Sequence, residues 1–266
     1  MIRNKPFVLN KCVRPKVAFF KLTSCEGCQL QVFNRESGVL KFLNQMEIVD
    51  FREAITGTSS CYDVAFIEGS VNNEEQKMKL IEIRHRADTV VALGSCACFG
   101  GINQLVASCE KGISEADKGK ISPSPKTPKA LDEIIQVDVH IYGCPVKKKE
   151  LESIFPRILS GKPVIHNKYP VCRECKQNHN ICLLDLGEPC LGSVTRGGCD
   201  AWCTGSGMGC WGCRGPIPKV TQRQLERLSQ RKGIDFDSLA ERMSCFGGFS
   251  NLLCQQTEDL YKSCQL

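Results

Sequence analysis

Long apolar runs are missing from this sequence. No stretch of 18 apolar residues occurs among its 266 residues, which argues against a membrane-spanning helix. The opening stretch MIRNKPFVLNKCVRPK has neither the apolar core of a secretory signal nor a twin-arginine pattern. We therefore expect a cytoplasmic protein without a direct membrane span, in a reducing compartment where disulfides are rare.

Basic runs are also scarce, although the formal net charge is +6. Lysines and arginines are spread along the chain, with VKKKE at 146–150 as the main run. No aromatic stacking pattern accompanies that run, so we expect no nucleic-acid partner.

Cysteine, in contrast, is abundant. The chain has 19 cysteines, and residues 189–213 hold five of them together with both tryptophans. A hydrophobic content of 42% allows a packed core without cross-links, whereas disulfide-dense scaffolds are usually small domains that lack one. In a reducing compartment such cysteines are more often metal ligands. The composition therefore favours metal sites over disulfides.

Residues 1–165 alternate apolar runs with helical patterns. Four short apolar runs, KVAFFKL, DVAFIEGS, DTVVALGS and VDVHIYGCP, are each followed by a helical or turn pattern. Buried strands that alternate with helices predict an α/β fold with a doubly wound parallel sheet. Residues 102–130 are polar and contain prolines, which predicts an excursion on the surface.

The pattern changes after residue 165. Glycine, proline and cysteine dominate residues 166–216 without apolar periodicity, so we expect this part to depend on bound metal for its order. Residues 217–266 return to helix. VTQRQLERLSQRKG begins with a capping box of Thr221 and Gln224, and a second helix is predicted near DFDSLAERM.

Twelve of the cysteines fall into three groups of four. Three members of the first group follow predicted strands, and the carboxyl ends of parallel strands meet at one edge of a sheet. The first group is Cys25, Cys28, Cys96 and Cys144. The other two groups lie in the glycine-rich part. They are Cys172, Cys175, Cys182 and Cys190, and then Cys199, Cys203, Cys210 and Cys213.

Structural zinc is the main alternative for these groups, because four-cysteine sites with CxxC pairs are common zinc sites. A redox-active CxxC would explain Cys25 and Cys28 but not Cys96 or Cys144. Glycines flank nearly every candidate ligand, so the backbone can approach a bulky cubane and donate N–H groups to its sulfurs. The sequence therefore favours iron–sulfur clusters. Fully cysteine-ligated cubanes have no open coordination position, which indicates electron transfer rather than catalysis.

Several motifs in this order resemble the small, electron-transferring subunit of nickel–iron hydrogenases over residues 16–216. They are TSCEGCQLQ, FIEGS, ALGSCACFGG, IYGCP and EPCLGSVTRGGC. The resemblance implies a flavodoxin-like domain over residues 1–165, an iron–sulfur domain over 166–216 and a helical tail over 217–266. It also implies three [4Fe-4S] clusters: a proximal cluster on the first cysteine group, a distal cluster on the second and a medial cluster on the third.

The same resemblance implies two partners. Catalysis would belong to a nickel–iron large subunit, so that no residue of this chain is catalytic, and an electron-acceptor subunit (a flavin or iron–sulfur protein) would dock near the distal cluster. Cys172 stands where periplasmic members have a histidine, and Cys203 adds a fourth medial ligand. Both departures resemble the soluble cytoplasmic branch, whose complexes couple dihydrogen to a nicotinamide, a deazaflavin or a heterodisulfide reductase.

Two alternatives remain open. The related single-cluster subunit of respiratory complex I and of membrane-bound hydrogenases is similar to residues 16–165, but its complex I form typically has adjacent cysteines in place of CEGC. A cluster-bearing scaffold protein without turnover is the alternative from another class.

Other polar residues receive simple interpretations. We expect Cys61 and Cys98 to be small buried hydrophobes, and Glu26 and Glu68 to hold loops by hydrogen bonds. We expect Arg214 to be solvated. His179 is a minor competitor for the distal site, and Cys12, Cys109, Cys245, Cys254 and Cys264 receive no assignment.

Overall fold

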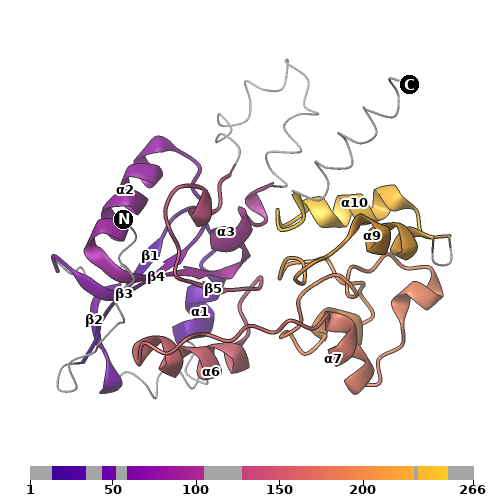
Figure 1. The fold of residues 1–266 in the computed structure, drawn as a ribbon, viewed down its shortest axis with the longest axis horizontal. Helices are drawn as coiled ribbons and strands as arrows, with labels where there is room; N and C mark the ends of the chain where they lie inside the picture. Colours follow the sequence, from indigo (N-terminus) through magenta and orange to yellow (C-terminus); the bar gives the residue numbers. More distant parts are fainter. Residues whose placement is uncertain (1–13, 34–43, 52–58, 105–127, 231–232, 251–266) are drawn as a thin grey trace.

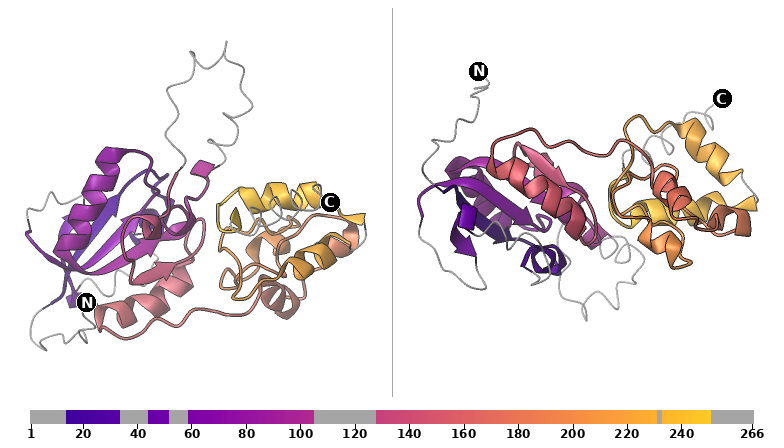
Figure 2. Two further views of the ribbon diagram at one scale, coloured as in Figure 1. Left: turned by 45° about the horizontal axis from the view of Figure 1, so that its top comes forward. Right: turned by 90° about the horizontal axis from the view of Figure 1, so that it is seen from below.

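The computed structural model describes residues 14–33, 44–51, 59–104, 128–230 and 233–250. An α/β part and a cysteine-rich part lie side by side, and the chain between α6 and α7 connects them (Figures 1 and 2). The elements are, in chain order, β1 Lys16–Lys21, α1 Gly27–Phe33, β2 Glu47–Phe51, β3 Tyr62–Glu68, α2 Glu74–Arg86, β4 Ala87–Leu93, α3 Gly94–Phe99, the 3-10 helix η2 Leu131–Glu133, β5 Val139–Ile141, α6 Lys148–Leu159, α7 Val171–Gln177, the 3-10 helix η3 Leu183–Leu186, α8 Trp202–Gly205, α9 Gln222–Ser229 and α10 Phe236–Ser244.

Five parallel strands form one sheet in the order β2-β1-β3-β4-β5. This is the flavodoxin-like order, in which the direction of winding reverses beside β1. The predicted doubly wound parallel sheet is therefore confirmed, but the prediction counted four strands and missed β2. The residues of β2 are exposed or half-buried, so this edge strand lacks the continuous apolar run that marks a buried parallel strand.

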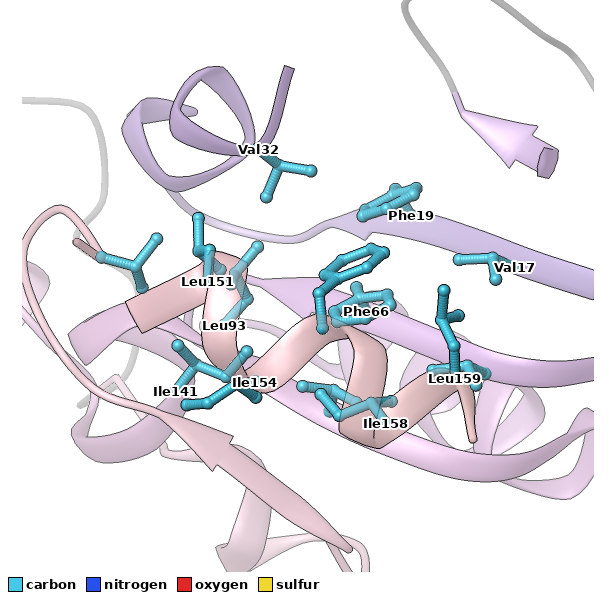
Figure 3. Close-up of a cluster of buried hydrophobic side chains, with 14 of the residues drawn as sticks. Val17, Phe19, Val32, Phe66, Leu93, Ile141, Leu151, Ile154, Ile158 and Leu159 are labelled. Atoms are coloured by element: carbon cyan, nitrogen blue, oxygen red, sulfur yellow. The ribbon is translucent and has the colours of Figure 1, made fainter. Parts of the chain in front are cut away.

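Alternate residues of the central strands pack on opposite faces of the sheet. Val17 and Phe19 of β1 belong to the cluster that includes α1 and α6, whereas Ala18 and Phe20 belong to the cluster with α2 and α3. Figure 3 shows side chains of α6 packed over the sheet. Phe66 stacks between Phe19 and Phe155, with ring centroids 5.0 and 4.9 Å away. Both faces of the sheet are therefore covered, which leaves its carboxyl edge as the place where loops collect.

The cysteine-rich part has an apolar core of its own. Val171, Leu191 and Val194 pack in one cluster with Leu228 of α9 and Met243 of α10. Residues 166–216, which we expected to depend on bound metal for their order, therefore also contribute to an apolar core that they share with the helices that follow. Both predicted helices are present in residues 217–250.

The predicted capping box at the start of α9 is also present. The Gln224 side chain accepts from the Thr221 N–H at 2.9 Å, and the Thr221 hydroxyl accepts from the Gln224 N–H at 3.3 Å.

Some sequence predictions lie outside the described residues: most of the excursion over 102–130, and Cys12, Cys109, Cys254 and Cys264. Among the helices of the described ranges, none is long and apolar enough to span a membrane.

Candidate metal centres

The first cysteine group lies at the carboxyl edge of the sheet. Cys25 follows β1, Cys28 lies in α1, Cys96 lies in α3 directly after β4, and Cys144 follows β5. The thiols are close enough to interact electrostatically: Cys25 and Cys96 both act on Cys144, and Cys96 and Cys144 both act on Cys28. The fold therefore brings together four thiols from distant parts of the sequence, since Cys25 and Cys144 are 119 residues apart.

Two glycines leave space for these thiols. A Cβ at Gly94, whose φ is +86°, would lie 2.4 Å from the Cys28 sulfur. A Cβ at Gly101, whose φ is +65°, would lie 2.5 Å from the Cys96 sulfur. Both positions need glycine for conformation and for space, so the backbone approaches the thiols as closely as a bulky cofactor requires.

Glu68, the last residue of β3, holds the first turn of α1, which carries Cys28. Its carboxylate is buried and accepts hydrogen bonds from the N–H groups of Cys28, at 3.2 Å, and Gln29, at 3.0 Å. Burial raises the pKa of Glu68, and these two hydrogen bonds oppose that shift. The predicted hydrogen-bonding role of Glu68 is confirmed, although its partners lie in the first turn of α1 and not in a loop. Glu26, with φ +67°, forms an ion pair with Lys21.

Burial also sets the protonation of the thiols. It raises the pKa of Cys96 and of Cys144 to about 11 and raises that of Cys28, and the neighbouring acidic groups add to the effect. Without metal these thiols are protonated at neutral pH. Because thiolates are the ligands, metal binding would release these protons. Four neighbouring thiols, of which Cys28 and Cys96 are buried, fit the donor set of an iron–sulfur cluster.

The second cysteine group surrounds α7. Cys172 and Cys175 lie in this helix, and a Cβ at Gly192 would lie 3.4 Å from the sulfurs of both Cys172 and Cys190. Burial raises the pKa of Cys172 to about 11, and the thiols of Cys190, Cys175 and Cys182 act in the same direction. Cys182 is exposed, so this group reaches the protein surface.

The third cysteine group lines a cavity of about 580 Å³. All four members, Cys199, Cys203, Cys210 and Cys213, contribute to its wall. Burial raises the pKa of Cys199 and of Cys213 to about 11. All four thiols therefore line one cavity, and together they are the donor set that a four-cysteine cluster requires.

The three groups are connected in space. Cys144 of the first group lines the same cavity as the third group. The backbone N–H of Cys210, in the third group, donates to the sulfur of Cys190, in the second, at 3.2 Å. The third group therefore lies between the other two.

Within the described ranges, no three His, Cys, Asp or Glu side chains are arranged to hold a single metal ion.

Arg214 corrects one sequence interpretation. It is 1% exposed rather than solvated and forms an ion pair with Glu150 of α6, with N–O distances of 2.7 and 2.8 Å. It also donates to the carbonyls of Gly197, at 3.0 Å, and Tyr142, at 2.6 Å. Burial opposes its charge, but Glu150 raises the pKa of Arg214 above its usual value. The sequence did not reveal this role because Glu150 is 64 residues away.

Glu174 is a second residue that the sequence analysis missed. It lies in α7 between two cysteines of the second group, is 6% exposed, and accepts from the backbone of the third group's loop. The donors are the N–H groups of Gly198, Cys199 and Ala201 and the hydroxyl of Tyr169. Its position inside CREC, like that of a glutamate in CEGC, was the available signal.

The remaining cysteines differ in burial. Cys98 is buried, as predicted, with its sulfur 3.8 Å from the carbonyls of Ala92 and Ile141. Cys61 is exposed, so the prediction of a buried hydrophobe is wrong there; it directly precedes β3, at the amino edge of the sheet. Cys245 is buried beside the Glu241 carbonyl.

The chain therefore has the architecture of a class of α/β proteins in two parts: a flavodoxin-like sheet with cysteines at its carboxyl edge, and a second, cysteine-rich part that follows it. A similar fold occurs in a chain of the [NiFeSe]-hydrogenase of Dm. baculatum, with a TM-score of 0.52 and 15% identity over 84% of this chain and 100% of that one.

Sequence comparisons place the chain within this class. Residues 25–157 match the family of the NADH ubiquinone oxidoreductase 20 kDa subunit. Sulfhydrogenase 2 subunit delta of Pyrococcus furiosus is 36% identical over 204 residues, 76% of this chain and 86% of the relative. The vhu F420-non-reducing hydrogenase of Methanocaldococcus jannaschii has a subunit that is 31% identical over 77% of this chain and 83% of the relative. The chain therefore belongs to the NADH ubiquinone oxidoreductase 20 kDa subunit family, among its hydrogenase subunits, which confirms the resemblance found in the sequence.

Proposed function

We propose that this chain is the electron-transfer subunit of a cytoplasmic nickel–iron hydrogenase and carries three [4Fe-4S] clusters. The proximal cluster is held by Cys25, Cys28, Cys96 and Cys144, the medial by Cys199, Cys203, Cys210 and Cys213, and the distal by Cys172, Cys175, Cys182 and Cys190. One observation carries the proposal: the medial cysteines lie between the other two groups, sharing a cavity with Cys144 and an N–H to sulfur hydrogen bond with Cys190.

Each bound cluster supplies a one-electron site that is reduced and reoxidised without an open coordination position. The protein's own part is to bind, orient and enclose. The thiols provide the ligands, Glu68 fixes the first turn of α1, which carries Cys28, and the N–H of Cys210 donates toward the sulfur of Cys190. Such N–H donors favour the reduced, more negative state and are one way in which a protein sets the potential of a cluster.

Two partners follow from the arrangement. A nickel–iron large subunit faces the proximal group and carries the catalytic centre, as the membership in a family with hydrogenase subunits implies. An electron-acceptor subunit, a flavin or iron–sulfur protein, docks beside the distal group. Cys182 of the distal group is exposed, and the exposed apolar side chains of Ile181 and Leu186 lie close to it in sequence. An exposed thiol beside exposed apolar side chains supports a docking site at the distal group.

The net charge agrees with this cofactor content. The chain has a formal charge of +6, and three oxidised clusters with four thiolates each would carry about −2 apiece. The loaded subunit would therefore be close to neutral.

The test is iron and sulfide analysis of the anaerobically purified native complex, with EPR spectra before and after dihydrogen is added. We expect about twelve irons per chain, four for each cubane, and cubane signals that appear under dihydrogen. About four irons would instead favour the single-cluster form related to the complex I subunit, whose family matches residues 25–157. Zinc in place of iron would favour a structural site.

A further inference from the structure

One peptide group beside the medial cysteines is held at both ends by side chains of opposite charge. The Gly197 carbonyl accepts from Arg214 Nε at 3.0 Å. The N–H of the same peptide group, which belongs to Gly198, donates to Glu174 Oε1 at 2.5 Å. Hydrogen bonds to charged groups are stronger than those between neutral groups. The peptide between Gly197 and Gly198, one residue before Cys199, therefore has a fixed orientation.

The two glycines are required for this arrangement. A Cβ at Gly197 would lie 2.4 Å from the Tyr169 ring, and a Cβ at Gly198 would lie 2.5 Å from Arg214 Nη2. The φ of Gly198 is +116°, a conformation that other residues rarely adopt. The two glycines of the sequence RGGC therefore leave space for the neighbouring side chains of Tyr169 and Arg214.

Both charges act on the medial thiols. The Glu174 carboxylate accepts from the N–H of Cys199, at 3.3 Å, and lies 3.8 Å from its sulfur. Arg214 directly follows Cys213, and its positive charge acts on both Cys199 and Cys213. Both side chains are buried, and charges interact more strongly in the low-dielectric interior than in water. The distal and proximal groups have no such pair of opposite buried charges among the described contacts.

We propose that Glu174 and Arg214 are positioning residues for the medial cluster, and that their opposite charges set its reduction potential relative to the other two. This inference rests on the proposed function. In the relay, the medial site takes one electron from the proximal site and passes one electron to the distal site. The negative charge of Glu174 disfavours the reduced medial site, and the positive charge of Arg214 favours it.

Redox titrations of the purified complex, followed by EPR cluster by cluster, test this inference. Glu174→Gln should raise the medial potential, and Arg214→Met should lower it, with smaller shifts at the proximal and distal clusters. Glu47→Gln is the matched control, because Glu47 is an exposed carboxylate on the edge strand β2. It should leave all three potentials unchanged.

A purely structural role for the two residues predicts a different outcome. Shifts of the same sign in Glu174→Gln and Arg214→Met, or no shift while all clusters are retained, would overturn the inference. If either variant loses the medial irons, Glu150→Gln decides, because it removes the partner charge of Arg214 without touching the cysteine loop. It should raise the medial potential, and an unchanged potential would overturn the inference.

The same samples separate this inference from the proposed function. About four irons per chain in the unaltered complex would overturn the three-cluster relay and this inference together. About twelve irons, with a medial potential that is the same in the charge variants as in the unaltered complex, would overturn this inference alone.

Discussion

The buried ion pair between Arg214 and Glu150 connects the α/β part to the cysteine-rich part, and its removal is the sharpest stability test. Arg214 makes two hydrogen bonds to Glu150, one to the Tyr142 carbonyl and one to the Gly197 carbonyl. Arg214→Met keeps an apolar stem of similar length but loses all of these bonds. Glu150 is then left as a buried charge, since its side chain is only 10% exposed.

The magnitude follows from what is left unpaired. Breaking a buried ion pair by removing one partner typically costs about 3–5 kcal/mol, because the remaining charge is uncompensated. For a domain of 150–250 residues, each kcal/mol lowers the melting temperature by about 2–4 °C. We therefore expect Arg214→Met to lower the melting temperature on the order of 10 °C.

A second substitution separates charge from packing. In the double variant Glu150→Met with Arg214→Met, no buried charge remains, so the double variant should be more stable than Arg214→Met alone. Lys149→Met is the control, because Lys149 belongs to the same helix and pairs with Asp200 of the cysteine-rich part. That pair is exposed, with side chains 83% and 63% accessible, and should contribute no more than about 1 kcal/mol.

The assay is thermal unfolding of the anaerobically purified complex, followed by the loss of cluster absorbance and by tryptophan fluorescence. A decrease of under 2 °C (less than about 1 kcal/mol) in Arg214→Met would refute the reasoning. So would a double variant that is less stable than the single one, because the uncompensated charge would then not be the cause.

Three further predictions concern the cysteine sites and pH. Cys203→Ala should turn the medial cubane into a three-iron centre, seen as a loss of about one iron per chain and a new EPR signal in the oxidised state, while alanine at the exposed Cys61 changes neither. Gly94→Ala should lose the proximal cluster, about four irons, because the added methyl group would lie 2.4 Å from the Cys28 sulfur; an unchanged iron count would contradict this. Burial lowers the pKa of His166 from 6.5 to about 4, so the unfolded chain takes up the proton first and stability falls as pH drops through this range. At pH 5 the loss should be about 1 kcal/mol for this half-buried ring, and His166→Phe should flatten the slope in denaturant titrations between pH 7 and 5.

The sequence predicted the sheet and its cysteine edge because these depend on local signals. Apolar runs such as DVAFIEGS mark buried strands, and parallel strands necessarily present their carboxyl ends on one side. The convergence of Cys25, Cys96 and Cys144 follows from that rule alone. The edge strand β2 was missed because an edge strand is only half-buried, so its sequence lacks the same signal.

The contacts of Arg214 and Glu174 depend on tertiary structure, and the position of Glu174 inside CREC was the one local signal for either residue. Arg214 meets Glu150 across 64 residues, and Glu174 meets Gly198 across 24. An arginine beside a ligand cysteine is equally compatible with solvent exposure, so burial had to be seen in the structure. Cys61 shows the converse, since free cysteine usually behaves as a small buried hydrophobe and the structure leaves Cys61 exposed.

In the first and third cysteine groups a buried glutamate lies close to the thiols, and in both it accepts hydrogen bonds from the backbone. Loops that carry ligands leave backbone N–H groups unpaired, and a buried carboxylate can accept from several of them. Glu68 accepts from two N–H groups in the first turn of α1, and Glu174 accepts from three in the loop that carries Cys199. The negative charge is unfavourable beside thiolates, so each carboxylate needs a nearby cation. Lys21 opposes the pKa shift of Glu68, and Arg214 binds the peptide that Glu174 holds. Arg214, which directly follows Cys213, is therefore the cation that offsets the negative charge of Glu174.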